Sequence, residues 1–400
     1  MQRPSVMAVH KLRFLFLALL ACSGAASAQS NWFNHEPRII GQDEMSEKKL
    51  RFDVKPLQGG DMKQIEQDSK MAKGLKMWTY KIKSTRSGTK GQSYTGTMVG
   101  KSPISTNGTT TTTVYVVPLI VQIGSQTFDP TVPDNSCLGG VIPLDFVKLS
   151  PMVIAYNDFT INGVDVGVAQ YSDAFQRANF WKKVSANGGT YHNKLNYKFL
   201  PAMTLTPDST QSVLYSTSGC TSVYGGIDVN WLDFGLKLFI IPSLASQGVG
   251  PTSLVTFMLY NTTMYNSDPS ACCIGGYHGA YGSPVQTYSP FQYDSAGFFG
   301  ASSEDTAIMS HEINEWQDDP LGNNPTPAWG HVGQVSGCQT NLEVGDPLTG
   351  TDYPPVAGIG INYHLQELAF YSWFYGPPSI GAGGKFSDNG TFTSAQGSCT

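Results

Sequence analysis

Apolar and polar positions along the chain predict a mixture of strands and helices. Residues 114–123 (VYVVPLIVQI) form a β-branched apolar run with the length of a buried strand. Further strands are predicted at 77–82, 196–205 and 253–265, and helices at 61–77 and 173–184. Residues 231–241 are predicted to form a helix or a buried strand. We therefore expect an α+β fold without an internal repeat.

The first residues have the pattern of an export signal. Basic residues precede the apolar run 14–21, and the small residues 26–28 (ASA) follow it, so we expect residues 1–28 to be a cleaved signal peptide. The run ending at Cys22 also resembles a lipoprotein box, which leaves lipidation as an alternative. Both alternatives predict a secreted protein, extracellular or periplasmic.

Residues 29–112 read as a basic N-terminal segment that precedes the main domain, residues 113–400. Residues 29–101 hold 14 Lys and Arg against 8 Asp and Glu, and a Thr-rich stretch of linker composition follows at 102–113. Residues 102–400 hold 8 Lys and Arg against 22 Asp and Glu, so the two parts are expected to attract each other. The segment is therefore a candidate pro-region covering an acidic cleft.

Charge and hydropathy exclude two classes of partner. After residue 199 the only basic side chains are Lys237 and Lys385, and phosphate binding needs clustered Lys or Arg, so we expect no nucleic-acid partner. No apolar run after the signal approaches 18 residues, so we expect no membrane span. An acidic site for a metal cation fits this charge balance better.

Six cysteines follow the signal peptide, an even number that suits disulfide bonds in an oxidising compartment. They allow 15 pairings, and the sequence does not choose among them. Buried free thiols are the alternative for some of them. Cys272 and Cys273 are adjacent, and if they are bridged we expect each to have a different partner, because a bridge between neighbours is strained.

The strongest chemical signal is the run SHEINEW, residues 310–316. We expect it in a helix capped by Ser302 or Ser303, where His311 and Glu315 lie one turn apart on one face and can hold one metal ion. Glu312 points elsewhere, as the general base does in HExxH metallopeptidases. The alternative is an amphipathic helix whose His and two Glu are solvated.

Acidic residues downstream of this helix can complete the metal site. Glu343 is our expected third ligand, and Asp346 is expected to orient the histidine through its second ring nitrogen. Asp319 competes as a ligand, since it follows His311 by eight residues on the same helical face. We expect Zn²⁺, with Ca²⁺ as the alternative because most of these ligands are oxygens.

A Gly-rich aromatic stretch, residues 272–282 (CCIGGYHGAYG), is expected to form an edge strand beside the cleft. There His278, with Tyr277 and Tyr281, is a candidate catalytic residue that hydrogen-bonds a developing oxyanion. A half-buried His in a turn is the alternative. His331 and His364 are weaker candidates. Residues 321–360 read as irregular, and 364–374 as a final helix or strand.

Residues 265–375 resemble a known family. SHEINEWQDDP, followed by Cys338, LEVGD and YHLQELAFYSWF, resembles the C-terminal part of the secreted phosphate-induced, EXORDIUM-like proteins and of related bacterial secreted proteins with HExxE. GGYHGAYG is similar to a segment of the same family. The resemblance implies a zincin-like mixed sheet packed on an active-site helix, and it implies functional positions at His311, Glu312, Glu315, Glu343 and Asp346. Its plant members are viewed as growth-related proteins without an assigned reaction.

Two functions remain open at this stage. The first is a secreted zinc-dependent hydrolase, most simply a metallopeptidase, acting on a peptide or protein substrate that pairs with an edge strand. The second is a non-catalytic extracellular protein in which the metal is structural and the aromatic surface binds cell-wall glycan or a protein partner.

Overall fold

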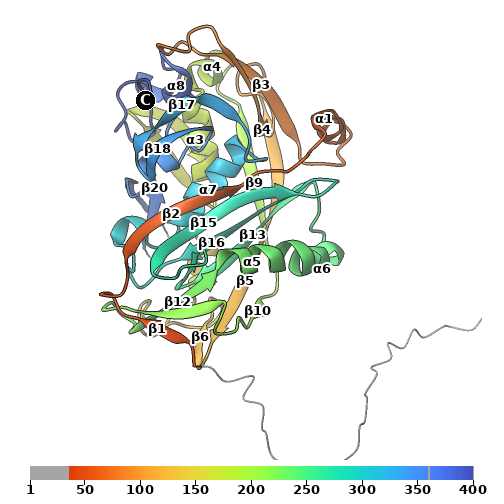
Figure 1. Cartoon of the computed structure of the whole chain (residues 1–400). Helices are drawn as coiled ribbons and strands as arrows, with labels where there is room; N and C mark the ends of the chain where they lie inside the picture. Colours follow the sequence, from red (N-terminus) through yellow and green to blue (C-terminus); the bar gives the residue numbers. More distant parts are fainter. Residues whose placement is uncertain (1–35, 359–360, 400) are drawn as a thin grey trace, which may run out of the picture. The chain divides into compact units, whose positions relative to one another are not determined.

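A long mixed β-sheet, curled on itself, organises the described part of the chain (Figure 1). The computed structural model describes residues 36–358 and 361–399. The expected signal peptide and Cys22 therefore lie outside the described residues. The expected α+β class is confirmed: the described chain is rich in strands, and its few helices pack against the sheet.

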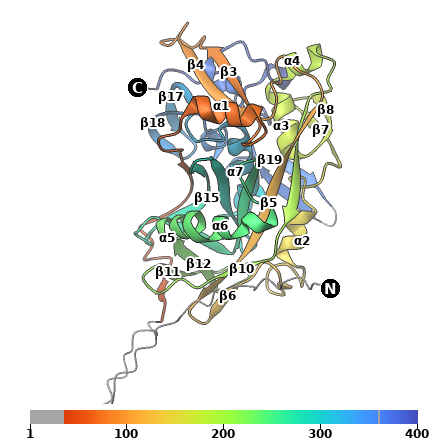
Figure 2. The ribbon, with the colours of Figure 1, turned by 90° about the vertical axis from the view of Figure 1, so that its right-hand side faces the viewer.

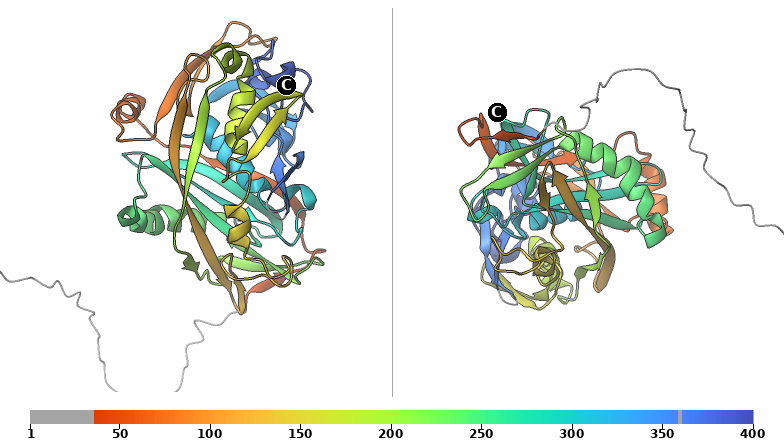
Figure 3. Two further views of the ribbon diagram at one scale, coloured as in Figure 1. Left: turned by 180° about the vertical axis from the view of Figure 1, so that it is seen from behind. Right: turned by 90° about the horizontal axis from the view of Figure 1, so that it is seen from below.

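Twelve strands of the described residues form the main sheet, in the spatial order β1-β11-β12-β14-β15-β16-β13-β5-β10, with β2 beside β15 and β6 and β9 beside β5. These strands are β1 (Arg38–Ile40), β2 (Glu47–Lys55), β5 (Thr109–Ile123), β6 (Gln126–Phe128), β9 (His192–Phe199), β10 (Met203–Leu205), β11 (Ser212–Ser216), β12 (Val223–Asp228), β13 (Ser253–Tyr260), β14 (Thr262–Tyr265), β15 (Ala271–Tyr281) and β16 (Gln286–Tyr293). Seen from behind in Figure 3, the long strand β5 runs beside β9.

The remaining described strands form hairpins around this sheet. They are β3 (Met77–Lys83) with β4 (Ser93–Val99), β7 (Asn157–Ile161) with β8 (Val164–Ala169), β17 (Pro325–Val332) with β18 (Val335–Asn341), and β19 (Asp352–Ala357) with β20 (Asn362–Gln366). The α-helices are α1 (Met62–Lys70), α2 (Pro143–Lys148), α3 (Tyr171–Asn179), α4 (Trp181–Ala186), α5 (Val229–Gly235), α6 (Ile241–Ser243), α7 (Ala307–Asp318) and α8 (Tyr371–Tyr375). The expectation of an irregular segment at 321–360 is wrong, because three strands lie there.

The two faces of the sheet carry different helices. On one face α7 contacts β15 and β16, and it belongs to the largest apolar core of the described residues. On the other face Asp233 of α5 accepts hydrogen bonds from Tyr277 and Tyr288, and Figure 2 shows the α5–α6 segment crossing in front of the sheet. Successive side chains of a strand point to opposite faces, so Tyr277 points to α5 and its neighbour His278 points to α7.

The N-terminal segment is not a separate appendage. β2 pairs in parallel with β15, Phe52 opposite Gly276, and residues 36–400 form one compact unit. Thr109–Thr113, which we expected in a linker, begin β5 and pair with β9, since their β-branched side chains suit a pleated strand. The expected boundary at 112/113 therefore falls inside a strand.

The described cysteines lie at disulfide distance in three pairs, Cys137–Cys220, Cys272–Cys273 and Cys338–Cys399. The expectation that Cys272 and Cys273 have different partners is wrong. Among the described helices, none is both long enough and apolar enough to cross a bilayer.

Candidate metal centre

Helix α7 carries the HExxE run through the interior of the protein. Every one of its residues is buried, and His311, Glu312 and Glu315 are exposed by only 0%, 0% and 1%. The alternative of a solvated amphipathic helix is therefore wrong. The helix begins after Thr306, so the expected cap at Ser302 or Ser303 is also wrong; these residues lie in a separate turn of 3-10 helix. It ends before Asp319-Pro320, where proline forbids another helical hydrogen bond.

His311 and Glu315 face each other across one helical turn. The His311 Nε2 atom lies 3.0 Å from Glu315 Oε2 and 3.6 Å from Asp346 Oδ1. The other ring nitrogen, Nδ1, lies 3.0 Å from Gln366 Oε1, an acceptor, so Nδ1 carries the proton and Nε2 presents a lone pair. A lone pair of nitrogen and a carboxylate oxygen repel each other at this distance, so either a metal cation or a proton belongs between them.

His278 enters the same region from β15. Its Nδ1 atom lies 3.6 Å from Glu312 Oε2 and 3.7 Å from Glu315 Oε2, and its Nε2 atom lies 3.9 Å from Glu343 Oε2. It is fully buried. The structure thus brings together the six main candidates from the sequence: His278, His311, Glu312, Glu315, Glu343 and Asp346.

Two overlapping groups have donor atoms spaced for a metal ion, and Glu315 belongs to both. They are His311, Glu315 and Asp346, and His278, Glu315 and Glu343, with all donor atoms of each group within 4.8 Å of one another. Several buried polar atoms in these groups lack any hydrogen-bond partner, namely both ring nitrogens of His278, His311 Nε2 and Glu343 Oε2. Both carboxylate oxygens of Glu312, which lies beside the two groups, also lack one. Buried polar atoms are rarely left unpaired, so their convergence fits a metal ion with its water.

Burial and mutual repulsion dominate the titration of these groups. Burial raises the pKa of three carboxyl groups well above their usual range, and the charge of Glu315 adds to the effect; these groups belong to Glu312, Glu343 and Asp346. Burial also raises the pKa of Glu315, but the neighbouring histidines more than offset this and lower it overall. Burial lowers the pKa of His278 to about 4. A divalent cation would let the carboxylates remain charged in this interior.

Amide side chains hold the candidate ligands in place. Gln366 accepts from His311, and its own NH₂ group donates to the Gly345 carbonyl at 2.7 Å. This is a correction to the expectation that Asp346 orients the histidine, because Asp346 lies on the Nε2 side of the ring. The amides of Gln334 and Gln339 donate to Asp346 instead, and Asn341 donates to Glu343 at 2.6 Å.

Two glycines make room for the reactive side chains. A Cβ atom on Gly276 of β15 would lie 2.6 Å from Glu312 Oε1, and one on Gly345 would lie 2.4 Å from His311 Nδ1. Any larger residue would push Glu312 or His311 from its position. The sequence signalled neither glycine individually, because their role depends on which side chain lies opposite them.

An open cleft of about 380 Å³ leads to the candidate ligands. Arg51–Val54 of β2 line one wall and Val335–Gln339 of β18 the other, while Glu315, Glu343 and Asp346 reach it from within. The ring of Phe52 stacks on His311, with ring centres 3.6 Å apart and planes inclined by 19°. The N-terminal segment therefore lies at the acidic cleft, as the sequence analysis expected, but it does so as a strand of the main sheet and not as a separate segment.

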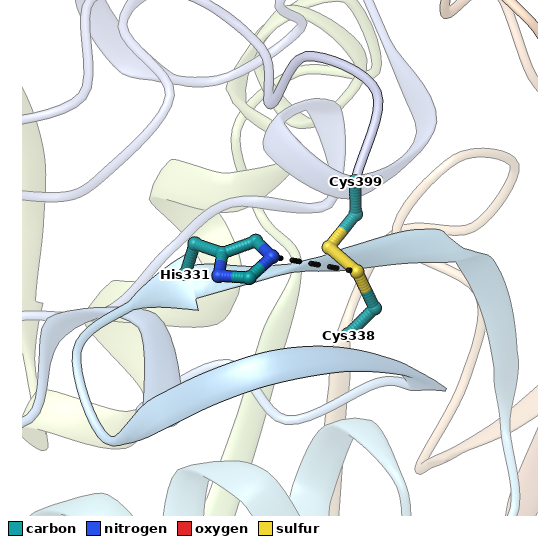
Figure 4. A group of neighbouring side chains, drawn as sticks. All are labelled: His331, Cys338 and Cys399. Carbon is teal, nitrogen blue, oxygen red and sulfur yellow. Dashed lines mark hydrogen bonds between the residues drawn. A yellow bond between two sulfur atoms is a disulfide. The ribbon is translucent and has the colours of Figure 1, made fainter.

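The weaker sequence candidates have other roles. Asp319 accepts backbone hydrogen bonds from Asn323 and Asn324 and shapes the turn after α7. Figure 4 shows His331 beside the Cys338–Cys399 disulfide, 3.8 Å from Cys338 Sγ. These sulfurs are bonded to each other, so they do not offer a thiolate site for a metal.

His364 and the two tyrosines beside His278 also lie outside the candidate centre. His364 pairs with Asp305 at 2.8 Å. Tyr277 faces α5, and Tyr281 packs on the ring of Tyr288, so neither joins His278 as an oxyanion donor.

Comparisons with protein-family models, curated proteins and solved structures found no match.

Proposed function

We propose that the protein is a secreted zinc-dependent hydrolase of the metallopeptidase type, with a zincin-like arrangement of sheet, helix and downstream ligands. The observation that carries this proposal is the convergence of unpartnered atoms of His278, His311, Glu312 and Glu343 around Glu315 in the protein interior. Two imidazoles and several carboxylates suit zinc better than calcium, which takes six to eight oxygen ligands.

His311 Nε2 and Glu315 Oε2 are the ligands that the motif spacing favours, and Asp346 is the carboxylate nearest to His311. His278 also lies 3.7 Å from Glu315 Oε2, and its other ring nitrogen lies 3.9 Å from Glu343 Oε2. In this position zinc supplies a Lewis acid that polarises a carbonyl group and makes a water molecule more acidic. Gln366 keeps His311 in the tautomer that can bind it.

Glu312 is the proposed general base. Its two carboxylate oxygens lack hydrogen-bond partners and lie beside the candidate ligands without belonging to either ligand group. Glu312 accepts a proton from a water molecule whose oxygen attacks the carbonyl carbon of a peptide bond. It then gives this proton to the leaving amine as the C–N bond breaks. We expected His278 to stabilise an oxyanion. Its ring, Glu315 and Glu343 offer donor atoms that all lie within 4.8 Å of one another, so we now assign His278 to metal binding.

The decisive experiment compares metal content with turnover. Protein from the full-length sequence, produced in an oxidising compartment, is analysed by elemental mass spectrometry and tested on fluorescein-labelled casein. We expect one zinc per chain, loss of zinc in His311→Ala and Glu315→Ala, and loss of turnover with retained zinc in Glu312→Gln. Glu44→Gln, on the exposed surface, is the matched control.

The outcomes separate the two functions. Turnover that persists in Glu312→Gln would refute the catalytic assignment. Stoichiometric calcium without turnover would favour the non-catalytic alternative, in which glycan or protein binding is the activity. Because four carboxylates surround the site, metal loading is tested with both ions.

A further inference from the structure

One edge of β2 faces the cleft. Both backbone polar groups of Phe52 bond the side-chain amide of Gln334: Phe52 N–H donates to Oε1 at 2.7 Å, and Gln334 Nε2 donates to the Phe52 carbonyl at 2.9 Å. In a parallel sheet the N–H and C=O groups of one residue point to the same edge of the strand, and those of the next residue point to the opposite edge. Phe52 and Val54 therefore present their backbone groups away from β15.

The side-chain amide of Gln334 imitates a paired strand at Phe52. A carboxamide offers one donor and one acceptor, as a peptide group does. Figure 1 shows β2 between β15 and the β17–β18 hairpin, and the cleft lies between β2 and β18. A peptide chain that enters the cleft would therefore meet a strand edge that already pairs with an amide.

β2 is a fixed part of the fold and forms one wall of the cleft. Phe52 is only 5% exposed and stacks on His311, and Leu57, just beyond the strand, is buried with its N–H donating to the Leu321 carbonyl at 2.9 Å. Removing β2 would expose these apolar groups and the ring of a candidate ligand. This argues against a pro-region that is discarded on activation.

The charge of the cleft favours cationic chains. Asp53, Glu315, Glu343 and Asp346 line it, and the one basic residue among its lining residues, Arg51, is paired with Glu47. Lys55 of β2 lies 3.9 Å from Asp53, and a divalent ion would offset two of the three other negative charges, so the cleft would remain negative. Lys and Arg side chains are therefore favoured over Asp and Glu.

We propose that an extended, basic peptide pairs through its backbone with the cleft-facing edge of β2 at Phe52 and Val54, replacing the amide of Gln334. The inference rests on the proposed function, because it assigns the substrate of the same site. It makes β2, rather than β15, the edge strand that positions the scissile peptide bond. This mode of binding is β-strand addition, in which main-chain hydrogen bonds give affinity.

The experiment removes one edge donor without changing the candidate ligands. Val54→Pro, prepared in the Glu312→Gln protein to prevent cleavage, lacks the Val54 N–H; Val54→Ala keeps it and is the matched control. The probe is a fluorescein-labelled octapeptide of alternating Lys and Val, measured by fluorescence anisotropy in about 0.15 M salt. We expect Val54→Pro to weaken binding about 3- to 10-fold, the worth of one hydrogen bond, and Val54→Ala by less than about 2-fold.

A modified peptide tests the same idea without altering the protein. N-methylation of every second peptide group removes the donors on one edge, so the methylated octapeptide should bind at least about 10-fold more weakly. An octapeptide of alternating Glu and Val should also bind more weakly. Equal binding of the methylated and parent peptides, or of the two Val54 variants, would overturn the proposal. Zinc content and casein turnover of the parent report separately on the proposed function.

Discussion

Replacing Gly276 by alanine tests whether Glu312 needs its observed position. The new Cβ would lie 2.6 Å from Glu312 Oε1 and 2.7 Å from Glu312 Cγ, whereas ordinary contacts begin at 3.4 Å. Gly276 is paired with β2 on one side and β16 on the other, so the strand cannot yield easily. The Glu312 side chain must therefore move by about 0.8 Å, the difference between the contact limit and the Oε1 distance.

A shift of this size has a calculable effect on turnover. Misplacing a catalytic group by about 1 Å can cost about 100-fold in rate, so we expect casein turnover to fall about 10- to 100-fold. The added methyl group should also lower the free energy of unfolding by about 1–3 kcal/mol, measured by urea denaturation. Zinc content should be unchanged, because Glu312 is not a proposed ligand.

Gly250→Ala is the matched control, since its Cβ would meet nothing within 4 Å. It should leave turnover and stability close to those of the parent. The reasoning is refuted if Gly276→Ala retains full turnover while Glu312→Gln loses it. In that case the carboxylate acts from a different position from the one that Gly276 accommodates.

Three further predictions concern the groups around the site and the stability of the fold. Gln366→Leu removes the acceptor of the His311 Nδ1 proton, so zinc affinity should fall about 10- to 100-fold in a competition with a fluorescent chelator; unchanged affinity would contradict this role. Removing zinc with a chelator should lower the free energy of unfolding by about 4 kcal/mol, relative to protein kept in zinc at about 1,000 times its Kd. Adding zinc back should restore this stability, whereas adding an ion that does not bind should not. The hydrogen bond to Asp305 raises the pKa of His364 above its usual value, so its stabilisation is complete below about pH 6.5 and is lost as pH rises through the higher folded-state pKa. The urea midpoint of the parent should therefore fall as the pH rises above about 6.5, and that of His364→Gln should fall less steeply. An equally steep fall in the variant would contradict this assignment.

The sequence predicted local features of the site well. The HExxE spacing alone brings His311 and Glu315 onto one helical face, because helix geometry is the same in every protein. The apolar run at 114–123 likewise lies within β5. These predictions needed only short stretches of chain, where periodicity determines which residues are neighbours.

The sequence did not predict which residues distant along the chain contact the candidate site. Phe52, Gln334 and Gln366 are separated from His311 by 259, 23 and 55 residues, and each is an ordinary residue in its own segment. Their roles follow from the pairing of β2 with β15 and from the path of the chain after α7. Composition also misled at 29–112, because a Lys-rich edge strand has the same composition as a detachable appendage.

The electrostatics of the centre connects folding with the proposed chemistry. Several carboxylates in one interior site repel each other and resist ionisation, and the histidines counter this directly only at Glu315. Such a cluster would weaken the fold unless a cation or bound protons compensate. A divalent ion compensates most effectively, because it neutralises ligands while leaving Glu312 free to accept a proton. The arrangement proposed to make Glu312 a base is therefore also one in which a bound metal would stabilise the folded protein, as the chelation experiment tests.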